Sequence, residues 1–294
     1  MELEEIIEEY GRAFRPREGY WLTRGLLDEV SSARGCIEAS LDLGITWRKI
    51  CYDNGFLITD NVRIPAIPPK EHDRVVYVSR DLENAYEVIA RKGSGFYKLK
   101  IARKYGAPTL EINGIHMHRI VGIDPWTDSK IKTLAARVKK KAKVLDTCMG
   151  LGYTAIHSLL RGADLVVTIE KDENVYWIAE HDPWSHGLRD ERVITLHGDS
   201  SEIIGSLPDA FFDRIIHDPP RFTRKTGDLY SLEFYREAYR VLRIGGIMFH
   251  YTGEPHRHGG PSVLKGISER LRKAGFFPVF YDRRAQGFVC YKRI

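Results

Sequence analysis

The chain has 294 residues, which is enough for one large domain or two ordinary ones. Hydrophobic residues make up 43% and charged residues 29% of it, a composition typical of globular proteins. No apolar run reaches the roughly 18 residues of a membrane-spanning helix, and the acidic N-terminus is unlike a signal peptide. We therefore expect a cytoplasmic protein with no membrane partner.

The cysteines and histidines do not indicate a metal centre. The four cysteines are scattered without a Cys-x-x-Cys pair: Cys36, Cys51, Cys148 and Cys290. This spacing suggests neither a zinc site nor a disulfide framework, and it favours a reducing compartment. Two His-x-His pairs occur, at 116–118 and 256–258. Such a pair without further ligands at the right spacing is usually made of ordinary polar residues, so we expect no metal.

The net charge of +5 is unevenly distributed. Glutamates crowd the first nine residues, whereas segments 98–104 and 137–143 are strongly basic. A phosphate backbone is one natural partner of such segments. The other interpretation is a solvated helix end, which carries no function.

The first 123 residues have mixed patterns and predict a smaller α+β domain. Helical spacing of apolar residues occurs at 3–14, 21–33 and 82–90, and alternating or short apolar runs predict strands at 36–41, 46–52, 55–59, 75–78, 96–101 and 109–112. We call residues 1–123 the accessory domain.

A second domain is predicted from 124 to 294. Asp124 and Pro125 are typical of a helix start, and that helix should run to about residue 138. Strands and helices then alternate, with strands at 144–147, 165–169, 193–196, 212–216, 247–251, 278–281 and 287–291 and helices at 153–161, 172–181, 200–206, 230–242 and 261–274. The connection before the last strand is too short for a crossover helix, so that strand should be antiparallel. We expect a Rossmann-like, seven-stranded sheet.

Polar groups lie at the carboxyl ends of the first three of these strands. Asp146 precedes a turn that contains Gly150 and Gly152, Glu170 ends the second strand, and Asp199 follows the third. Glu170 lies 18 residues beyond Gly152, close to the offset of a carboxylate that binds ribose hydroxyls. The turn lacks the Gly-x-Gly-x-x-Gly spacing of a dinucleotide site, which argues against a dehydrogenase.

These features resemble the class I S-adenosylmethionine-dependent methyltransferases, whose sheet ends in a reversed strand. The resemblance covers residues 144–294 and implies S-adenosylmethionine as cofactor. It implies the following cofactor-binding residues: Asp146, Cys148, Gly150, Gly152, Thr154, Glu170, Lys171, Asp199 and Ser200. Cys148 stands where the family usually has glycine.

Asp218, Pro219 and Pro220 follow the fourth strand and are the candidate catalytic residues. They resemble the Asp/Asn-Pro-Pro-aromatic motif of enzymes that methylate exocyclic base amines. The lone pair of such an amine is delocalised into the ring, so hydrogen bonds from its N–H groups to a carboxylate and a carbonyl would direct the lone pair to the methyl group. Candidate substrate contacts are Arg221, Phe222, His217 and Tyr251; the motif's aromatic residue is displaced by one position to Phe222.

The pattern as a whole resembles an archaeal group of predicted RNA methyltransferases, which implies ribosomal RNA as partner and the N4 amine of cytidine as target. On this resemblance the accessory domain is expected to bind RNA. No cysteine lies near Asp218 to attack carbon 5, and no Lys-Asp-Lys-Glu set suggests ribose methylation. The alternatives are an aminopropyltransferase acting on a polyamine, a methyltransferase acting on adenine, tRNA or protein, and a non-catalytic factor that binds the cofactor.

Overall fold

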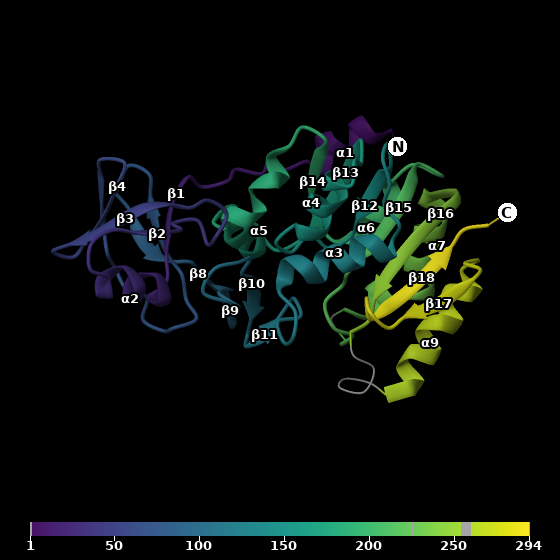
Figure 1. Ribbon diagram of the computed structural model, residues 1–294. Coiled ribbons are helices and arrows are strands. Elements are labelled where there is room, and N and C mark those ends of the chain that lie inside the picture. Colours follow the sequence, from purple (N-terminus) through teal and green to yellow (C-terminus); the bar gives the residue numbers. More distant parts are fainter. Residues whose placement is uncertain (1, 225, 254–259, 294) are drawn as a thin grey trace. The chain divides into compact units, whose positions relative to one another are not determined.

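The computed structural model describes residues 2–224, 226–253 and 260–293 (Figure 1). The chain forms two compact units, each made of discontinuous segments. The α/β unit consists of Met1–Phe14, Asp128–Glu173 and Leu188–Ile294, and the β-rich unit of Arg15–Thr127 and Asn174–Gly187. The units therefore differ from the predicted division at 123/124. No helix formed by the described residues combines the length and apolarity that a membrane crossing requires.

A seven-stranded sheet forms the centre of the α/β unit. Its strand order is β14-β13-β12-β15-β16-β18-β17. The bounds are β12 (Lys143–Asp146), β13 (Leu165–Glu170), β14 (Val193–His197), β15 (Phe212–His217), β16 (Leu242–Tyr251), β17 (Val279–Asp282) and β18 (Gly287–Tyr291). The first five strands are parallel, whereas β18 is antiparallel to both β16 and β17. The predicted sheet with a reversed last strand is confirmed.

Helices cover this sheet, whose central strands are buried on both faces, as the strands of parallel sheets usually are. All six residues of β15 are buried. The helices are α1 (Leu3–Tyr10), α4 (Tyr153–Leu160), α6 (Ser200–Ser206), α7 (Leu232–Val241) and α9 (Gly260–Lys273), with a 3₁₀ turn η2 (Gly227–Tyr230). The elements α3 (Pro125–Ala135), α5 (Glu173–Glu180) and η1 (Pro183–Arg189) run from one unit into the other along the chain.

The N-terminal helix belongs to the α/β unit, not to the accessory domain in which the sequence analysis placed it. Ile6 is fully buried and lies in one apolar cluster with Leu196 and Ile203. The backbone N–H of Arg12 also donates to the carbonyl of Thr195, at 2.9 Å. Burial of an apolar side chain and pairing at the sheet edge therefore fix this segment.

Three small antiparallel sheets make up most of the β-rich unit. Their orders are β1-β6-β7, β2-β3-β4-β5 and β11-β10-β9-β8. The bounds are β1 (Gly19–Leu22), α2 (Arg24–Ser32), β2 (Ile37–Ala39), β3 (Arg48–Asp53), β4 (Phe56–Thr59), β5 (Val62–Pro65), β6 (Val76–Ser79), β7 (Ala85–Glu87), β8 (Ile89–Lys92), β9 (Gly95–Lys100), β10 (Thr109–Ile112) and β11 (Ile115–His116).

Two helix predictions in this unit were wrong, in part or entirely. Trp21 lies in β1, and helix α2 starts later because the side chain of Thr23 caps it by accepting from the N–H of Leu26, at 3.2 Å. The predicted helix 82–90 is a turn followed by β7 and β8. Leu82 has a φ of 65°, a conformation that an α-helix does not contain.

A disulfide between Cys36 and Cys51 contradicts the expectation that the cysteines stay unpaired. Strands β2 and β3 pair antiparallel with Ile37 opposite Ile50. The preceding and following residues are then neighbours, and the two cysteine Cα atoms lie 4.1 Å apart. Strand register brings these cysteines together, and register is not visible in their sequence spacing.

In the basic segment 98–104, two lysines are paired inside the protein, which neither a phosphate-binding surface nor a solvated helix end would show. Lys98 is buried and its ammonium lies 2.9 Å from Asp73 and 3.2 Å from Glu111. Lys100 contacts the same two carboxylates, at 3.0 and 2.8 Å. These lysines form an internal ion-pair network and are not an open surface for phosphates.

Candidate active site

Four acidic side chains, which we call the acidic row, lie at the carboxyl ends of neighbouring strands in the seven-stranded sheet. We call this end of the sheet its carboxyl edge, and the opposite end its amino edge. Strands β14, β13, β12 and β15 are neighbours in that order and run parallel. Their carboxyl ends carry the four acids in the same order: Asp199, Glu170, Asp146 and Asp218. Ligands of open α/β sheets bind at this edge, so the predicted residues are brought together where a site is expected.

Asp146 is buried and only partly satisfied. Its Oδ2 accepts hydrogen bonds from the hydroxyls of Thr154, at 3.1 Å, and Thr168, at 2.9 Å. Its Oδ1 has no partner within the described structure. Burial raises the pKa of Asp146 to about 8, and the negative charges of Asp218 and Glu170 add to this rise. A cationic ligand near this edge would stabilise the ionised form.

The two glycines of the turn have different roles. Gly150 has a φ of 55°, and a Cβ built on it would meet open space. Gly152 has a φ of 74°, and a Cβ there would lie 2.5 Å from the side chain of Leu188. Gly152 is thus required by packing at the start of α4, whereas Gly150 borders open space beside the acidic row.

Glu170 is held against this turn. Its Oε2 accepts from the N–H of Gly150, at 3.1 Å, and its Oε1 from the N–H groups of Lys171 and Asp172, each at 2.9 Å. Burial raises the pKa of Glu170 to about 7, although these hydrogen bonds oppose the rise. The side chain therefore has one orientation before any ligand binds.

Asp199, Ser200 and Lys171 also have structural partners. Asp199 caps α6 by accepting from the N–H of Ser201, at 2.9 Å, and pairs with the ammonium of Lys171, at 3.1 Å. The hydroxyl of Ser200 donates to the carbonyl of Thr147. The hydroxyls of Ser200 and Thr154 thus hold the loop after β12 by hydrogen bonds within the protein. Cys148 is partly buried, and burial raises the pKa of its thiol.

Asp218 is paired with a lysine that the sequence analysis missed. The Nζ of Lys132 lies 2.7 Å from Asp218 Oδ2 and 3.2 Å from Asp128 Oδ2, and 3.9 Å from the ring centre of Tyr251. Lys132 is 0% exposed. Burial alone would lower the pKa of Lys132, but the charges of Asp128 and Asp218 raise it above its ordinary value. Lys132 is therefore a permanent cation at the site.

A pattern in α3 could have revealed Lys132. Four polar residues at i, i+1, i+4 and i+5 occupy one side of this helix and are all buried: Asp128, Ser129, Lys132 and Thr133. A polar stripe on the buried side of a helix is unusual and marks an internal polar network.

The backbone after Asp218 is fixed by an aromatic residue. The hydroxyl of Tyr230 donates to the carbonyl of Pro220, at 2.8 Å. For the carbonyl of Pro219, no hydrogen-bond partner is found in the described parts of the chain. Phe222 is 56% exposed, and its ring centre lies 5.3 Å from that of Tyr230. Arg221 is exposed as well.

The predicted substrate contact of His217 is wrong. Its ring is fully buried; Nε2 donates to the carbonyl of Leu229, at 2.9 Å, and Nδ1 accepts from the hydroxyl of Thr147, at 2.7 Å. Burial lowers its pKa to about 3, so it stays neutral. The other His-x-His pair, at 256–258, lies outside the described residues.

The histidines at 116 and 118 make ordinary polar contacts. His116 bonds to Glu111 and His118 to Thr109, each at 3.0 Å. No group of three or more histidine, cysteine or acidic residues suited to a metal ion occurs among the residues that the structure describes.

Similarity to known proteins identifies the family. The uncharacterized protein MJ1233 of Methanocaldococcus jannaschii is 47% identical over 204 residues, which are 69% of this chain and 69% of that protein. The chain belongs to the family of this archaeal protein. A family model for guanidinoacetate N-methyltransferase matches residues 109–253.

More distant relatives are group-transfer enzymes. Polyamine aminopropyltransferase 2 of Streptomyces coelicolor is 32% identical over 148 residues, 48% of this chain but only 26% of that protein. A candidate ribosomal RNA large subunit methyltransferase, MJ1649 of Methanocaldococcus jannaschii, is 28% identical over 112 residues, 37% of this chain and 28% of that protein. Spermidine synthase from Thermotoga maritima superposes with a TM-score of 0.55 at 17% identity, over 77% of this chain and 81% of the other. The chain thus has the α/β fold shared by methyltransferases and aminopropyltransferases.

Proposed function

We propose that this protein transfers a methyl group from S-adenosylmethionine to the exocyclic amine of a base in RNA. The observation that carries the proposal is the pair of acceptors at the end of β15: the Asp218 carboxylate, with one oxygen bound to Lys132, and the carbonyl of Pro219. An amine has two N–H groups for these two acceptors. The preference for cytidine N4 in ribosomal RNA rests on the family resemblance.

The acidic row fits the cofactor. Glu170 accepts three backbone N–H groups, so about one of its four lone-pair sites, on Oε2, is left for a ribose hydroxyl; Asp199 can accept from the adenine amine. The open space at Gly150 lets a ligand approach the backbone of the turn. Asp146 has an unpartnered oxygen in the same row. When bound, S-adenosylmethionine supplies an electrophilic methyl group on a sulfonium cation, a charge that these carboxylates favour.

Lys132 supports an aryl amine as the acceptor. Its ammonium neutralises much of the charge of Asp218 and fixes the carboxylate, and a carboxylate has enough lone pairs to accept from a substrate as well. A cytosine or adenine amine is neutral and approaches this site without repulsion. Asp218 would take up, along its hydrogen bond, the proton that the amine nitrogen must lose on methylation.

The target base must be unpaired or flipped, because its amine is otherwise occupied in a duplex. The ring of Tyr251 and the carboxylate of Asp218 both contact the ammonium of Lys132. Phe222 and Arg221 follow the motif as exposed side chains. Aromatic rings and guanidinium groups are the usual stacking partners of splayed RNA bases. These residues are therefore the proposed substrate contacts.

Aminopropyl transfer to a polyamine is the second candidate, because polyamine aminopropyltransferases are among the relatives and spermidine synthase has the same fold. A polyamine is a polycation, and its attacking end would approach Asp218 close to the buried ammonium of Lys132. The segment after the motif is also basic, with Arg221, Arg224 and Lys225 preceding Asp228. Both features favour a neutral acceptor on an anionic polymer.

A paired assay separates the two. The purified protein would be given labelled S-adenosylmethionine with RNA, and decarboxylated S-adenosylmethionine with putrescine or spermidine. The proposal predicts label in RNA and no aminopropyl product. Product in the second reaction alone would replace the proposal by the aminopropyltransferase alternative. Label in protein or in tRNA alone would keep the chemistry and change the acceptor.

A further inference from the structure

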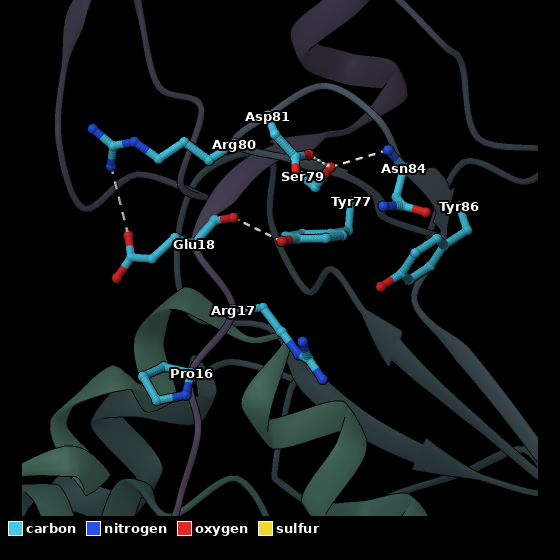
Figure 2. A pocket seen from close by; sticks show the side chains of 9 residues that line it. All are labelled: Pro16, Arg17, Glu18, Tyr77, Ser79, Arg80, Asp81, Asn84 and Tyr86. Atoms are coloured by element: carbon cyan, nitrogen blue, oxygen red, sulfur yellow. Dashed lines mark hydrogen bonds and ion pairs between the residues drawn. The ribbon is translucent and has the colours of Figure 1, made fainter.

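A hollow lies in the β-rich unit, within a single compact part of the chain. Its volume is about 740 Å³, a size typical of small-molecule sites. Figure 2 shows its lining side chains: Pro16, Arg17, Glu18, Tyr77, Ser79, Arg80, Asp81, Asn84 and Tyr86. We call this hollow the tyrosine pocket. No residue of it belongs to the candidate active site.

Two tyrosines give the pocket a rigid aromatic wall. The ring centres of Tyr77 and Tyr86 lie 5.6 Å apart, and Tyr86 is 40% exposed. Tyr77 donates to the carbonyl of Glu18, at 2.7 Å, and the Tyr86 hydroxyl bonds to His181 Nε2, at 2.8 Å. One side of Tyr86 stacks on Trp177, at 6.1 Å and 28°. The exposed ring is therefore held in place and can accept a planar ligand.

The pocket is lined by two arginines and two carboxylates, and Arg17 is the arginine that makes no ion pair with any residue that the structure describes. Its guanidinium is exposed and has no ion-pair or hydrogen-bond partner among the described residues. The other charged side chains are engaged, since Arg80 pairs with Glu18 at 3.9 Å and Asp81 accepts from the N–H of Glu83 at 3.1 Å. Figure 2 shows Arg17, Tyr77 and Tyr86 bordering the same space.

Arg17 acts electrostatically on both tyrosines. Burial raises the pKa of Tyr86 above its ordinary value, and the positive charge of Arg17 opposes that rise. The same opposition applies to the pKa of Tyr77. These effects agree with Figure 2, in which Arg17 and the two rings border one space, so that a ligand with a negative group beside an aromatic plane can contact both.

We propose that the tyrosine pocket binds a nucleotide, with its base stacked on Tyr86 and its phosphate paired with Arg17. The side-chain amide of Asn84, at the rim, offers a donor and an acceptor to a base edge. Stacking on aromatic side chains beside a cation is how proteins hold single-stranded nucleic acid. The bound nucleotide could come from a single-stranded segment of RNA or from a free nucleotide. We infer the RNA segment, and this choice rests on the proposed function.

Binding of a fluorescein-labelled oligouridylate, followed by anisotropy, tests the proposal on the full chain. Tyr86→Ala should weaken binding about 5- to 100-fold, whereas Tyr86→Phe, which keeps the ring, should bind nearly as the original protein does. The matched control is Tyr52→Ala, since Tyr52 is 42% exposed and lies outside the pocket. Arg17→Gln should reduce the slope of log affinity against log salt by about 1.

The outcomes are distinct. Equal effects of Tyr86→Ala and Tyr52→Ala on binding would overturn the proposal that the tyrosine pocket binds a nucleotide. An unchanged salt slope in Arg17→Gln would overturn it as well. The original protein could also bind the oligomer and uridine monophosphate with equal affinity, and Tyr86→Ala could lose both. This result would support a nucleotide site and identify a free nucleotide as its ligand. Pocket binding without methyl transfer to RNA would reject only the proposed function, and methyl transfer that Tyr86→Ala leaves unchanged, with unchanged RNA binding, would reject only the pocket.

Discussion

The two edges of the seven-stranded sheet differ in how their charged side chains are held. At the carboxyl edge, Glu170, Asp199 and Asp218 each have fixed partners within a few residues of the strand ends or on a neighbouring helix. At the amino edge, Lys139, Lys140 and Lys141 precede β12 as exposed side chains. Fixed carboxylates can define the position of a ligand, whereas exposed lysines contribute only charge. The following experiments test this contrast.

The largest effect is expected at Asp218. Replacing it by Ala or Asn removes the charged acceptor for the amine and should reduce methyl transfer by about 10² to 10⁴-fold, while the affinity for S-adenosylmethionine stays nearly unchanged. Single-turnover kinetics and calorimetry measure the two quantities. Asp228→Asn, an exposed carboxylate ten residues further on, is the control. A parallel decrease in cofactor affinity would place Asp218 in the cofactor site instead.

Lys132→Met should cause the largest decrease in stability. It leaves the carboxylates of Asp128 and Asp218 without their cation, and breaking a buried ion pair costs about 3 to 5 kcal/mol. Denaturant unfolding measures the change. Lys130→Met, at an exposed position of the same helix, should have an effect within about 0.5 kcal/mol. Similar decreases in both variants would show that Lys132 is not a structural partner of Asp218.

Glu170→Ala should weaken binding of S-adenosylmethionine at least tenfold, because charge-assisted hydrogen bonds contribute about 1.5 to 3 kcal/mol each. Isothermal calorimetry provides the measurement, with Glu191→Ala, an exposed acid, as the control. A folded Glu170 variant with unchanged affinity would remove the ribose assignment.

Cofactor binding should release protons near neutral pH. The pKa of Glu170 is about 7 and that of Asp146 about 8, so both carboxyls bind protons in the free protein; a bound cation favours their ionised forms. Affinity should therefore increase as the pH rises from about 6 to about 8. Calorimetry at pH 7 in buffers of different ionisation enthalpy measures the release, expected at roughly one proton. Neutral S-adenosylhomocysteine should release fewer, and equal release would contradict the charge argument.

The smallest effect is expected at the amino edge. Replacing Lys139, Lys140 and Lys141 by Ala should weaken RNA binding and lower its salt slope by about 0.9 or less for each phosphate that these lysines neutralise, without changing turnover at saturating RNA. Filter binding at several salt concentrations is sufficient. If affinity and slope both stay the same, this segment is only a solvated loop.

The sequence predicted the α/β unit well because each strand contains a run of apolar residues and most are followed by a helix of clear periodicity. The acidic row at the strand ends was predicted for the same reason, since parallel strands place their carboxyl ends together. The β-rich unit was harder. Its short strands depend on turns such as that at Leu82 and on register, which also determines the Cys36–Cys51 pair.

Burial explains what the sequence analysis missed at the site. His217 and Lys132 are both polar, and their sequence context does not say that they face the interior. His217 was predicted to contact substrate, but its two ring nitrogens bond to Thr147, which follows β12, and to Leu229 in η2. Lys132 was overlooked because its partner Asp218 lies 86 residues away in the chain.

The position of the transferred methyl group tests the central claim most directly. RNA labelled by the protein would be digested to nucleosides and separated by chromatography with mass spectrometry. Two acceptors, Asp218 and the Pro219 carbonyl, predict label on an exocyclic amine, and the family resemblance predicts that of cytidine. Label on the amine of adenosine would keep the mechanism and change the base. Label on ribose or on carbon 5 of a pyrimidine would contradict the account.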